Sequence, residues 1–359
     1  MMRTVQNFLV QVKRYWLTVS FVIGFAVDLL LLNKIDSLFD NLVLLTNATI
    51  ATVAFFLLYA ASTERMPEWL SRKLYKYAPV FMQYGFGGLL SGMLVFYGRS
   101  GDFIANAPFL LMIIAVIFGN EFIVKRSDKL IYHLALYYVG IFSYCILIIP
   151  VLLGKMGELV FLLSGLVALL LVVGLVKLLA WVIPNFIRVN IKRIILTIGF
   201  IYIGFNTLYF SNLIPPIPLS LTHIEIAHSV SRGTDGAYRI TSEQQPWWRE
   251  HTPIQVVINP SQSYIACFAR VYAPTRLTTD IYHHWEYKND AGEWVEQFRL
   301  SYPISNTNIR GYRGYTQIAS FTEGEWRCSV KTERGQVLGR KAVTIDLDKQ
   351  RGELVTRVE

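Results

Sequence analysis

Charged side chains are scarce in this chain. Asp, Glu, Lys and Arg make up 16% of its 359 residues, whereas a soluble domain contains about 25%. The charge is also divided unevenly, because Lys and Arg outnumber Asp and Glu by 17 to 9 up to residue 221 and by 17 to 16 after it. The positive excess lies in short loops between apolar runs. It therefore indicates the orientation of membrane spans and argues against a nucleic-acid partner.

Familiar catalytic and metal-binding motifs are also missing. The chain has no Gly-x-Ser-x-Gly, His-Glu-x-x-His, P-loop or Cys-x-x-Cys sequence, which argues against the enzyme and redox classes that depend on them. We therefore expect no catalytic residue, no bound metal and no cofactor. An enzyme that uses another chemistry stays open.

Cysteine is nearly absent as well. Cys145 lies inside an apolar run and suits a small core position. Cys267 and Cys328 lie in two β-like runs of the second half. They can form a disulfide if that half lies outside the cytoplasm and their side chains meet, and the sequence leaves this pairing open.

Apolar runs long enough to cross a bilayer, which takes about 20 residues, are what the chain has in abundance. We predict a bundle of seven transmembrane helices followed by an all-β domain. The predicted spans are residues 16–32, 42–61, 78–97, 103–124, 130–153, 159–183 and 194–213. No small-residue cleavage site follows the first of them, so we interpret it as an uncleaved span.

The loops between these spans alternate in charge. One side holds 14 Lys and Arg residues, and the other holds only Lys34, Arg99 and Lys155. Excess Lys and Arg mark the cytoplasmic side of a membrane protein. We therefore place the N-terminus in the cytoplasm and, after seven crossings, the C-terminal domain outside it.

A proline-rich joint separates the two halves. Pro215, Pro216 and Pro218 cannot continue a helix, because each lacks an N–H group. Closely spaced prolines favour an extended, semi-rigid connector. We predict a transmembrane domain at 1–213, the joint at 214–221, a β-domain at 222–347 and a flexible tail at 348–359.

The second half has the composition of a β-domain. About eight short runs rich in β-branched and aromatic residues are separated by turn sequences such as Asn289-Asp-Ala-Gly292 and Glu333-Arg-Gly335. No long helical period is found there. This pattern predicts a β-sandwich or a small barrel.

Several short segments carry a resemblance to a known family. They are Gly119-Asn-Glu-Phe122, Phe142-Ser-Tyr144, the joint from Asn206 to Leu221, His228-Ser-Val230, His283-His-Trp285, Gly311-Tyr-Arg-Gly-Tyr-Thr316, Gly324-Glu-Trp-Arg327 and Gly335-Gln-Val-Leu338. Together they resemble a bacterial polytopic membrane family whose C-terminal part is domain of unknown function 2914. Gly314 departs from the family pattern, which more often has a bulky aromatic or basic residue there. The resemblance implies a multi-pass protein of the bacterial inner membrane and implies no activity.

Polar and ionisable side chains within or beside the predicted spans are candidates for function, because burying them in a bilayer is costly. The intramembrane candidates are Asp28, Arg99, Asn120, Glu121, Tyr144 and Asn206. The outer-face candidates are Asp36, Asp40, Asn41, Asn212 and His228. Asp28 and Arg99 are predicted on the same side, where a pair between them can form a polar pocket. The competing interpretation is that these groups only lock helix packing through buried polar contacts.

Four tryptophans are the aromatic candidates of the β-domain. Trp285 and Trp326 lie on strand-like runs, where an aromatic stripe is more often core than sugar platform. Trp247 and Trp248 follow a proline in a predicted loop or edge, where they suit a membrane interface or a glycan. The neighbouring His283-His284 pair points to opposite faces of its strand, so it is a poor metal set.

Three functions compete on these observations. We favour a membrane protein whose exterior β-domain binds an envelope partner, either a protein or a polysaccharide. The second is a transporter or transport accessory that uses Asp28, Arg99 and Glu121. The third is a membrane enzyme that acts on a lipid-linked envelope precursor with Asp28, Asp36 or His228. The stiff joint, the nearly neutral β half and the missing catalytic motifs favour the first, with the lipid bilayer as the other partner.

Reporter fusions test the predicted orientation. We expect alkaline phosphatase fused after Glu359 to be active, because an odd number of crossings carries the chain end out of the cytoplasm. Green fluorescent protein at the same site should stay dark. Both reporters inserted after Lys129, in a loop predicted to be cytoplasmic, should give the opposite pattern. Fluorescence at the C-terminal site without phosphatase activity would contradict the topology.

Overall fold

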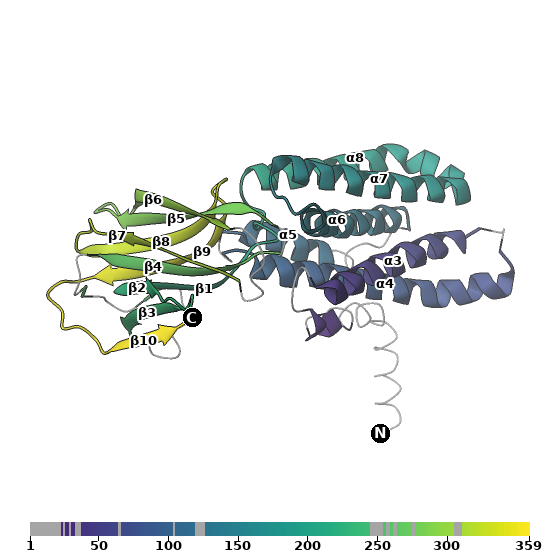
Figure 1. Ribbon diagram of the computed structural model, residues 1–359. Coiled ribbons are helices and arrows are strands. Elements are labelled where there is room, and N and C mark those ends of the chain that lie inside the picture. Colours follow the sequence, from purple (N-terminus) through teal and green to yellow (C-terminus); the bar gives the residue numbers. More distant parts are fainter. Residues whose placement is uncertain are drawn as a thin grey trace, which may run out of the picture. The chain divides into compact units, whose positions relative to one another are not determined.

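The computed structural model describes residues 23, 26–28, 30–32, 37–63, 66–102, 105–118, 126–244, 254–255, 259–260, 264–274, 277–304 and 311–359. The chain divides into two compact units (Figure 1). The helical unit comprises Met1–Tyr97 and Ala107–Ser211, and the β unit comprises Gly98–Asn106 and Asn212–Glu359. The predicted order, helices first and a β-domain after them, is confirmed.

The helices are α3 (Leu38–Ala60), α4 (Glu68–Arg99), α5 (Ala107–Phe118), α6 (Arg126–Leu153), α7 (Glu158–Val182) and α8 (Pro184–Phe210). The strands are β1 (Ser220–Ala227), β2 (Ser229–Arg232), β3 (Tyr238–Glu243), β4 (Ile265–Tyr272), β5 (Thr279–Lys288), β6 (Trp294–Ile304), β7 (Tyr312–Ile318), β8 (Gly324–Thr332), β9 (Val337–Ile345) and β10 (Leu354–Val358).

Four of the described helices are long and apolar enough to cross a membrane: α3, α4, the Lys129–Leu153 part of α6, and α7. They correspond to four of the seven predicted spans. The predicted span 16–32 lies largely outside the described residues, and span 103–124 is described only as the short helix α5. Residues 194–210 of the predicted span 194–213 lie in α8, whose first half also carries Arg188, Lys192 and Arg193. The structure therefore supports a membrane protein without establishing the count of seven.

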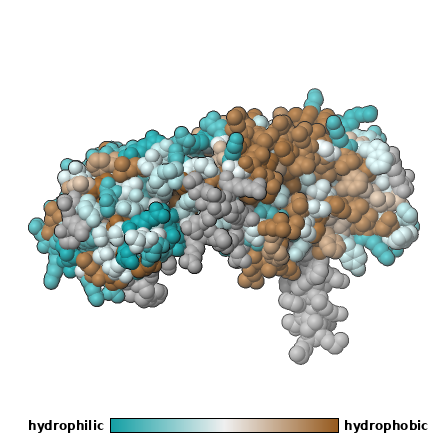
Figure 2. Space-filling model, in the orientation of Figure 1, coloured by the Kyte–Doolittle hydropathy of each residue, from teal (hydrophilic) through white to brown (hydrophobic). Residues whose placement is uncertain are grey.

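Helix α7 shows how the helical unit meets an apolar surrounding. Its buried face includes the small residues Ser164, Gly165 and Ala168, while Leu159 and Trp181 are 83% and 72% exposed. A helix that is apolar on every side is typical of a bilayer. Figure 2 shows apolar side chains across the helical unit and a mostly polar surface on the β unit.

Helices α3 and α4 approach each other through the glycines of α4. A Cβ atom added at Gly85 would lie 2.7 Å from the backbone nitrogen of Ala51 and 2.8 Å from the carbonyl oxygen of Asn47. At Gly88 the same addition would meet the Asn47 side chain. Small residues permit such close helix contacts in membranes. The glycines of α4 thus form the packing surface against α3.

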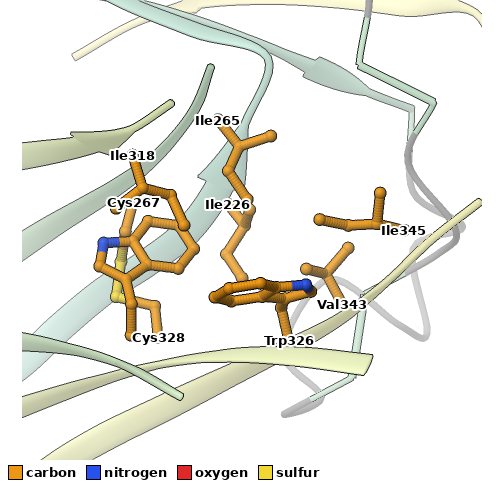
Figure 3. Close-up of a cluster of buried hydrophobic side chains, with 9 residues drawn as sticks. Ile226, Ile265, Cys267, Ile318, Trp326, Cys328, Val343 and Ile345 are labelled. Atoms are coloured by element: carbon orange, nitrogen blue, oxygen red, sulfur yellow. A yellow bond between two sulfur atoms is a disulfide. The ribbon is translucent and has the colours of Figure 1, made fainter. Parts of the chain in front are cut away.

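The β unit contains three antiparallel sheets. Sheet A has the order β1-β4-β7, sheet B has the order β10-β3-β2, and sheet C has the order β6-β5-β8-β9. Residues from sheets A and C form one buried cluster, so these two sheets form a sandwich (Figure 3). A second cluster joins sheet A to sheet B. The predicted β-sandwich is therefore present, with a third sheet on the far side of sheet A.

Strand β4 is the middle strand of this arrangement. Ile265 and Cys267 face sheet C, while Ala266 and Phe268 between them face sheet B. Alternate residues of a strand point to opposite faces, and a strand covered on both faces needs a continuous apolar run. Each fully buried side chain the size of Phe268 contributes roughly 1.5 to 3 kcal/mol.

The joint is packed within the β unit. Helix α8 ends at Phe210, and Asn212 has a positive φ of 56°, a conformation that commonly ends helices. The Asn212 Nδ2 atom donates to the carbonyl oxygen of Arg334 at 2.9 Å. Gln336 Nε2 donates to the carbonyl oxygen of Ile214 at 3.1 Å. The prolines thus stop the helix as predicted, and the chain then follows the β8–β9 turn.

The loop between α4 and α5 also belongs to the β unit. The backbone nitrogen of Asp102 donates to the carbonyl oxygen of Val337 at 3.2 Å. Gly101 lies so close to Val337 and Pro216 that a Cβ atom there would be 3.1 Å from the Val337 carbonyl oxygen. The sequence did not predict this attachment, because nothing in the loop marks it as part of the β-domain.

The end of the chain differs from prediction. Residues 348–359 were expected to be a flexible tail, but Leu354–Val358 form β10, which pairs with β3. Arg270 Nη1 also donates to Glu359 Oε2 at 2.6 Å. The run Leu354-Val-Thr-Arg-Val358 has strand composition, and its pairing with β3 covers an edge that a flexible tail would leave open.

The Gly85 contact predicts a large effect from one methyl group. Gly85→Ala should destabilise the helical unit by about 1 to 3 kcal/mol, because the new atom meets the backbone of α3. Gly199→Ala in α8 is the matched control, since a Cβ atom there meets nothing within 4 Å. Alanine should even raise helix stability at that position, by about 0.5 to 1 kcal/mol. Thermal unfolding in nanodiscs measures both, and equal effects would contradict the close packing.

Candidate functional site

The face of sheet C that points away from the sandwich core is polar. Strand register places alternate residues of β5, β6, β8 and β9 on it, opposite the face that holds Trp285 and Cys328. We call this the polar face; its members are Tyr282, His284, Glu286, Lys288, Trp294, Glu296, Arg299, Glu325, Arg327, Ser329, Lys331 and Arg340. It holds five cations and three carboxylates.

Glu286 lies at the centre of the polar face. Its carboxylate accepts hydrogen bonds from Arg327 Nε at 2.7 Å, Ser329 Oγ at 2.6 Å and Lys331 Nζ at 3.1 Å. The side chain is only 9% exposed. Burial alone would raise the pKa of Glu286, but the bonds from Arg327 and Ser329 and the charge of Lys331 lower it to about 2. The carboxylate is therefore ionised and holds the two cations in place.

Two aromatic rings of the polar face lie beneath cations. The Arg327 guanidinium carbon is 4.3 Å from the centroid of the Trp294 ring, and Arg299 lies 4.4 Å from the ring of Tyr282. Lys288 Nζ is also 5.8 Å from Trp294. These contacts keep long basic side chains extended over the sheet while their hydrogen-bonding edges stay available.

His284 lies on β5 of the polar face, in register with Arg299 of β6 and Ser329 of β8. Its Nδ1 atom bonds to Glu296 Oε2, whereas its buried Nε2 atom has no hydrogen-bond partner. Arg340, which is in register with Ser329 beside His284, likewise has a buried Nε atom without a partner. The polar face thus contains hydrogen-bonding capacity that the described protein atoms leave unused.

The opposite face of β5 carries a second polar group inside the core. Thr316 Oγ1 accepts a hydrogen bond from Trp285 Nε1 at 3.1 Å and lies 3.0 Å from His283 Nδ1. His283 Nε2 lies 3.2 Å from the Tyr302 hydroxyl. Burial lowers the pKa of His283 to about 3, with a smaller effect from His284, so the ring is neutral. The His-x-Trp spacing therefore places two partners of one threonine on the same face.

The lack of a side chain at Gly314 is explained by Tyr302, the same tyrosine that lies beside His283. A Cβ atom there would overlap the ring of Tyr302, at 2.6 Å from its Cζ atom. The tyrosine occupies the space that a bulky residue would need at position 314.

Cys267 of β4 and Cys328 of β8 form a disulfide that joins sheets A and C, as Figure 3 shows. The pairing that the sequence left open is thus present. Ligand atoms of these cysteines and of His283 lie within 4.8 Å of one another. A disulfide offers no thiolate to a metal, so the group does not form a metal site in this state.

Sheets A and B enclose a further polar cluster. Glu225 accepts hydrogen bonds from His223 and Ser242. Burial would raise the pKa of Glu225, but these two partners lower it. His228, a predicted outer-face candidate, is 2% exposed, and its Nε2 atom lies 3.3 Å from Glu243 Oε1. Because it is enclosed, His228 does not offer a reactive group at the surface.

Among the intramembrane candidates, Asp28 bonds to Asn47 and Ser91 within the helical unit. Arg99 belongs to the β unit, so the Asp28–Arg99 pair stays a prediction. Asn206 Nδ2 donates to the carbonyl oxygen of Tyr202 in its own helix. A buried carboxylate takes the nearest donors, and neighbouring helices supply neutral ones here. Arg99 is exposed at the end of α4, and Tyr144 is buried within α6.

The remaining candidates have structural roles or lie outside the described residues. Asp40 and Asn41 belong to the first turn of α3, where the Asp40 backbone nitrogen and the Asn41 side chain both bond to Ser37. Trp285 and Trp326 belong to the core of the sandwich, so they cannot serve as a surface platform. Outside the described residues lie Asp36, Asn120, Glu121, Trp247 and Trp248.

A cavity of about 360 Å³ opens in the helical unit at the α7–α8 turn. Its lining is formed by Tyr59, Ser62 and Thr63 from the end of α3, and by residues 182–186. No charged side chain is among these residues. Its polar groups are the hydroxyls of Tyr59, Ser62 and Thr63 and the amide of Asn185.

Sequence reasoning missed the polar face as a unit. Glu286 and Trp294 were within predicted strands, and alternation along β5 and β6 would have placed them together once the strands were paired. The register of β5 with β8 is what brings Arg327 and Lys331 to Glu286. Sequence separation hides this, because β8 lies about 40 residues further along the chain.

Glu286 predicts an acid-dependent loss of stability. Its pKa in the fold, about 2, is below the ordinary 4.5, so its stabilising effect is complete above pH 4.5 and is lost as pH falls toward 2. The loss should be on the order of 2 to 3 kcal/mol. Glu286→Gln should be less stable than the parent at neutral pH and should converge with it near pH 2.

Tryptophan fluorescence of the full-length protein during chemical unfolding measures this dependence. Glu325→Gln is the matched control, because Glu325 is 49% exposed and its ion-pair partner among the described residues is Lys288. The control should keep the parent's pH profile. Parallel profiles for the parent and Glu286→Gln would show that the Glu286 cluster does not stabilise the fold.

Comparisons with known proteins identify a family domain in one part of the chain. Residues 278–345 match the family model described as protein of unknown function (DUF2914), and this range covers β5 to β9. No curated protein matches the chain.

Among solved structures, the chain is similar to the alkylpurine DNA glycosylase AlkC of Pseudomonas fluorescens bound to DNA containing an abasic site analog. The identity is 9%, the TM-score is 0.20, and the match covers 88% of this chain and 99% of that one. A similarity at that level carries no argument about fold or function. The C-terminal region thus contains a DUF2914 domain.

Proposed function

We propose that this protein is a bacterial inner-membrane protein that presents its β unit outside the cytoplasm to bind an acidic polysaccharide of the cell envelope. The helical unit, with seven spans, anchors the chain. The polar face of sheet C is the binding surface. The proposal is of a binding module and assigns no catalytic step.

The observation that carries the location is the disulfide between Cys267 and Cys328. Disulfides persist in oxidising compartments and are rare in the cytoplasm. The loop charges, 14 Lys and Arg residues against three, independently favour a cytoplasmic N-terminus and an exterior β unit. Both arguments favour the same side.

The polar face supports the choice of partner. Arg299 and Arg340 are not tied to the Glu286 carboxylate, so their charges are available to an anion. Basic groups beside aromatic rings suit a polymer that carries carboxylates or phosphates more than a neutral glycan. A protein partner is the competing outcome.

Binding measurements on the full-length protein in nanodiscs test this function. We expect binding to an acidic polysaccharide such as polygalacturonate and none to neutral dextran. The double variant Arg299→Gln/Arg340→Gln should bind at least about tenfold more weakly, which corresponds to about 1.4 kcal/mol. Biolayer interferometry at low and high salt supplies the affinities, and salt should weaken the parent's binding.

Arg239→Gln is the control for a general loss of charge. Arg239 lies on sheet B, where it is exposed and paired with Asp235, and its removal should leave the affinity unchanged. Equal binding to dextran, or an equal loss in the control, would refute the polar face as the site. If the protein captures an envelope protein and binds no polysaccharide, the partner is a protein and the polysaccharide proposal is wrong.

A further inference from the structure

Asp28 is a carboxyl group in the helical unit, and its hydrogen-bond partners among the described residues, Asn47 and Ser91, are neutral. It is 2% exposed, and it contacts Asn47 of α3, which is 5% exposed, and Ser91 of α4, which is fully buried. Asn47 Nδ2 lies 3.1 Å from Asp28 Oδ2 and 3.4 Å from Oδ1. Placing an isolated carboxylate charge in such surroundings is costly.

The hydroxyl of Ser91 shows where a proton is needed. Its Oγ atom lies 3.0 Å from the carbonyl oxygen of Gly88 and 3.2 Å from Asp28 Oδ2. A serine hydroxyl has one hydrogen, and an ionised carboxylate and a carbonyl are both acceptors only. With an ionised Asp28, one of the two contacts would therefore lack a well-directed hydrogen bond.

A proton on Asp28 Oδ2 allows both contacts of the Ser91 hydroxyl to be directed hydrogen bonds. The acid then donates to Ser91 Oγ, and Ser91 donates its own hydrogen to the Gly88 carbonyl oxygen. The Asn47 amide donates to the remaining carboxyl oxygen. The contacts among Asp28, Ser91 and Gly88 are then all hydrogen bonds, and no charge is buried.

Within the described parts of α3 and α4, no charged group takes the place of that proton. The buried residues of α3 and α4 at this level, Leu44, Asn47, Gly88 and Ser91, are neutral. The nearest buried titratable residue of α3 is Asp40, seven residues before Asn47 and about 10 Å along the helix. On α4 it is Tyr97, six residues after Ser91.

We propose that Asp28, Asn47 and Ser91 form a proton-binding site inside the helical unit, with Asp28 carrying the proton as a neutral carboxylic acid. Release of the proton leaves a charge at the close contact between α3 and α4. Proton occupancy is thereby coupled to the packing of these two helices. This inference is independent of the function proposed for the β unit.

Infrared spectroscopy of the full-length protein in nanodiscs tests the proposal directly. We expect the carbonyl stretch of a protonated carboxylic acid at neutral pH, shifted when the protein is exchanged into D₂O. The band should be lost in Asp28→Asn and kept in Asp235→Asn, whose carboxylate is exposed on a loop of the β unit. In Ser91→Ala it should persist but shift, because the acid loses its acceptor.

Two outcomes would overturn the proposal. Absence of the acid band in the folded parent would show that Asp28 is ionised, and an unchanged band in Asp28→Asn would assign the proton elsewhere. A sodium ion is the alternative occupant, and it predicts no acid band together with a sodium-dependent rise in unfolding temperature that Asp28→Asn abolishes. If Asp28→Asn fails to fold, the shift in Ser91→Ala decides between them.

Discussion

The burial of β4 on both faces is the constraint on which the β unit depends. Ile265 and Cys267 contribute to the core shared with sheet C, and Ala266 and Phe268 contribute to the core shared with sheet B. One strand therefore belongs to two hydrophobic clusters, and the disulfide at Cys267 adds a covalent link to β8. Sheets B and C are held to sheet A by this strand, so the polar face of sheet C has a rigid support.

Strand alternation then distributes the polar chemistry. On β5, His283 and Trp285 enter the core and share Thr316, while His284 and Glu286 lie on the polar face. The two faces have different uses. The inner polar atoms bond to one another, which lets polar side chains remain in the core. On the polar face, Glu286 bonds to Arg327 and Lys331, and Arg327 extends over the ring of Trp294.

Buried polar groups of the helical unit also bond to one another, but through contacts between neighbouring helices. Asp28 is satisfied by an amide and a hydroxyl, and Gly88 leaves the space into which the Asn47 amide reaches. The glycines of α4 thus allow close helix contact and also admit a polar group to it. Helix packing and proton binding share one place in the fold, which is why the charge state of Asp28 bears on both.

The sequence by itself determined the order of the two units, four apolar helices of sufficient length, the end of α8 before the prolines, and the β character of the second half. These follow from local composition and periodicity, which need no partner. Only the tertiary structure decided that Cys267 meets Cys328, that Glu286 collects Arg327 and Lys331, and that Asp28 bonds to Asn47 and Ser91. Each of these contacts depends on strand register or helix rotation between distant segments, and no local pattern encodes those.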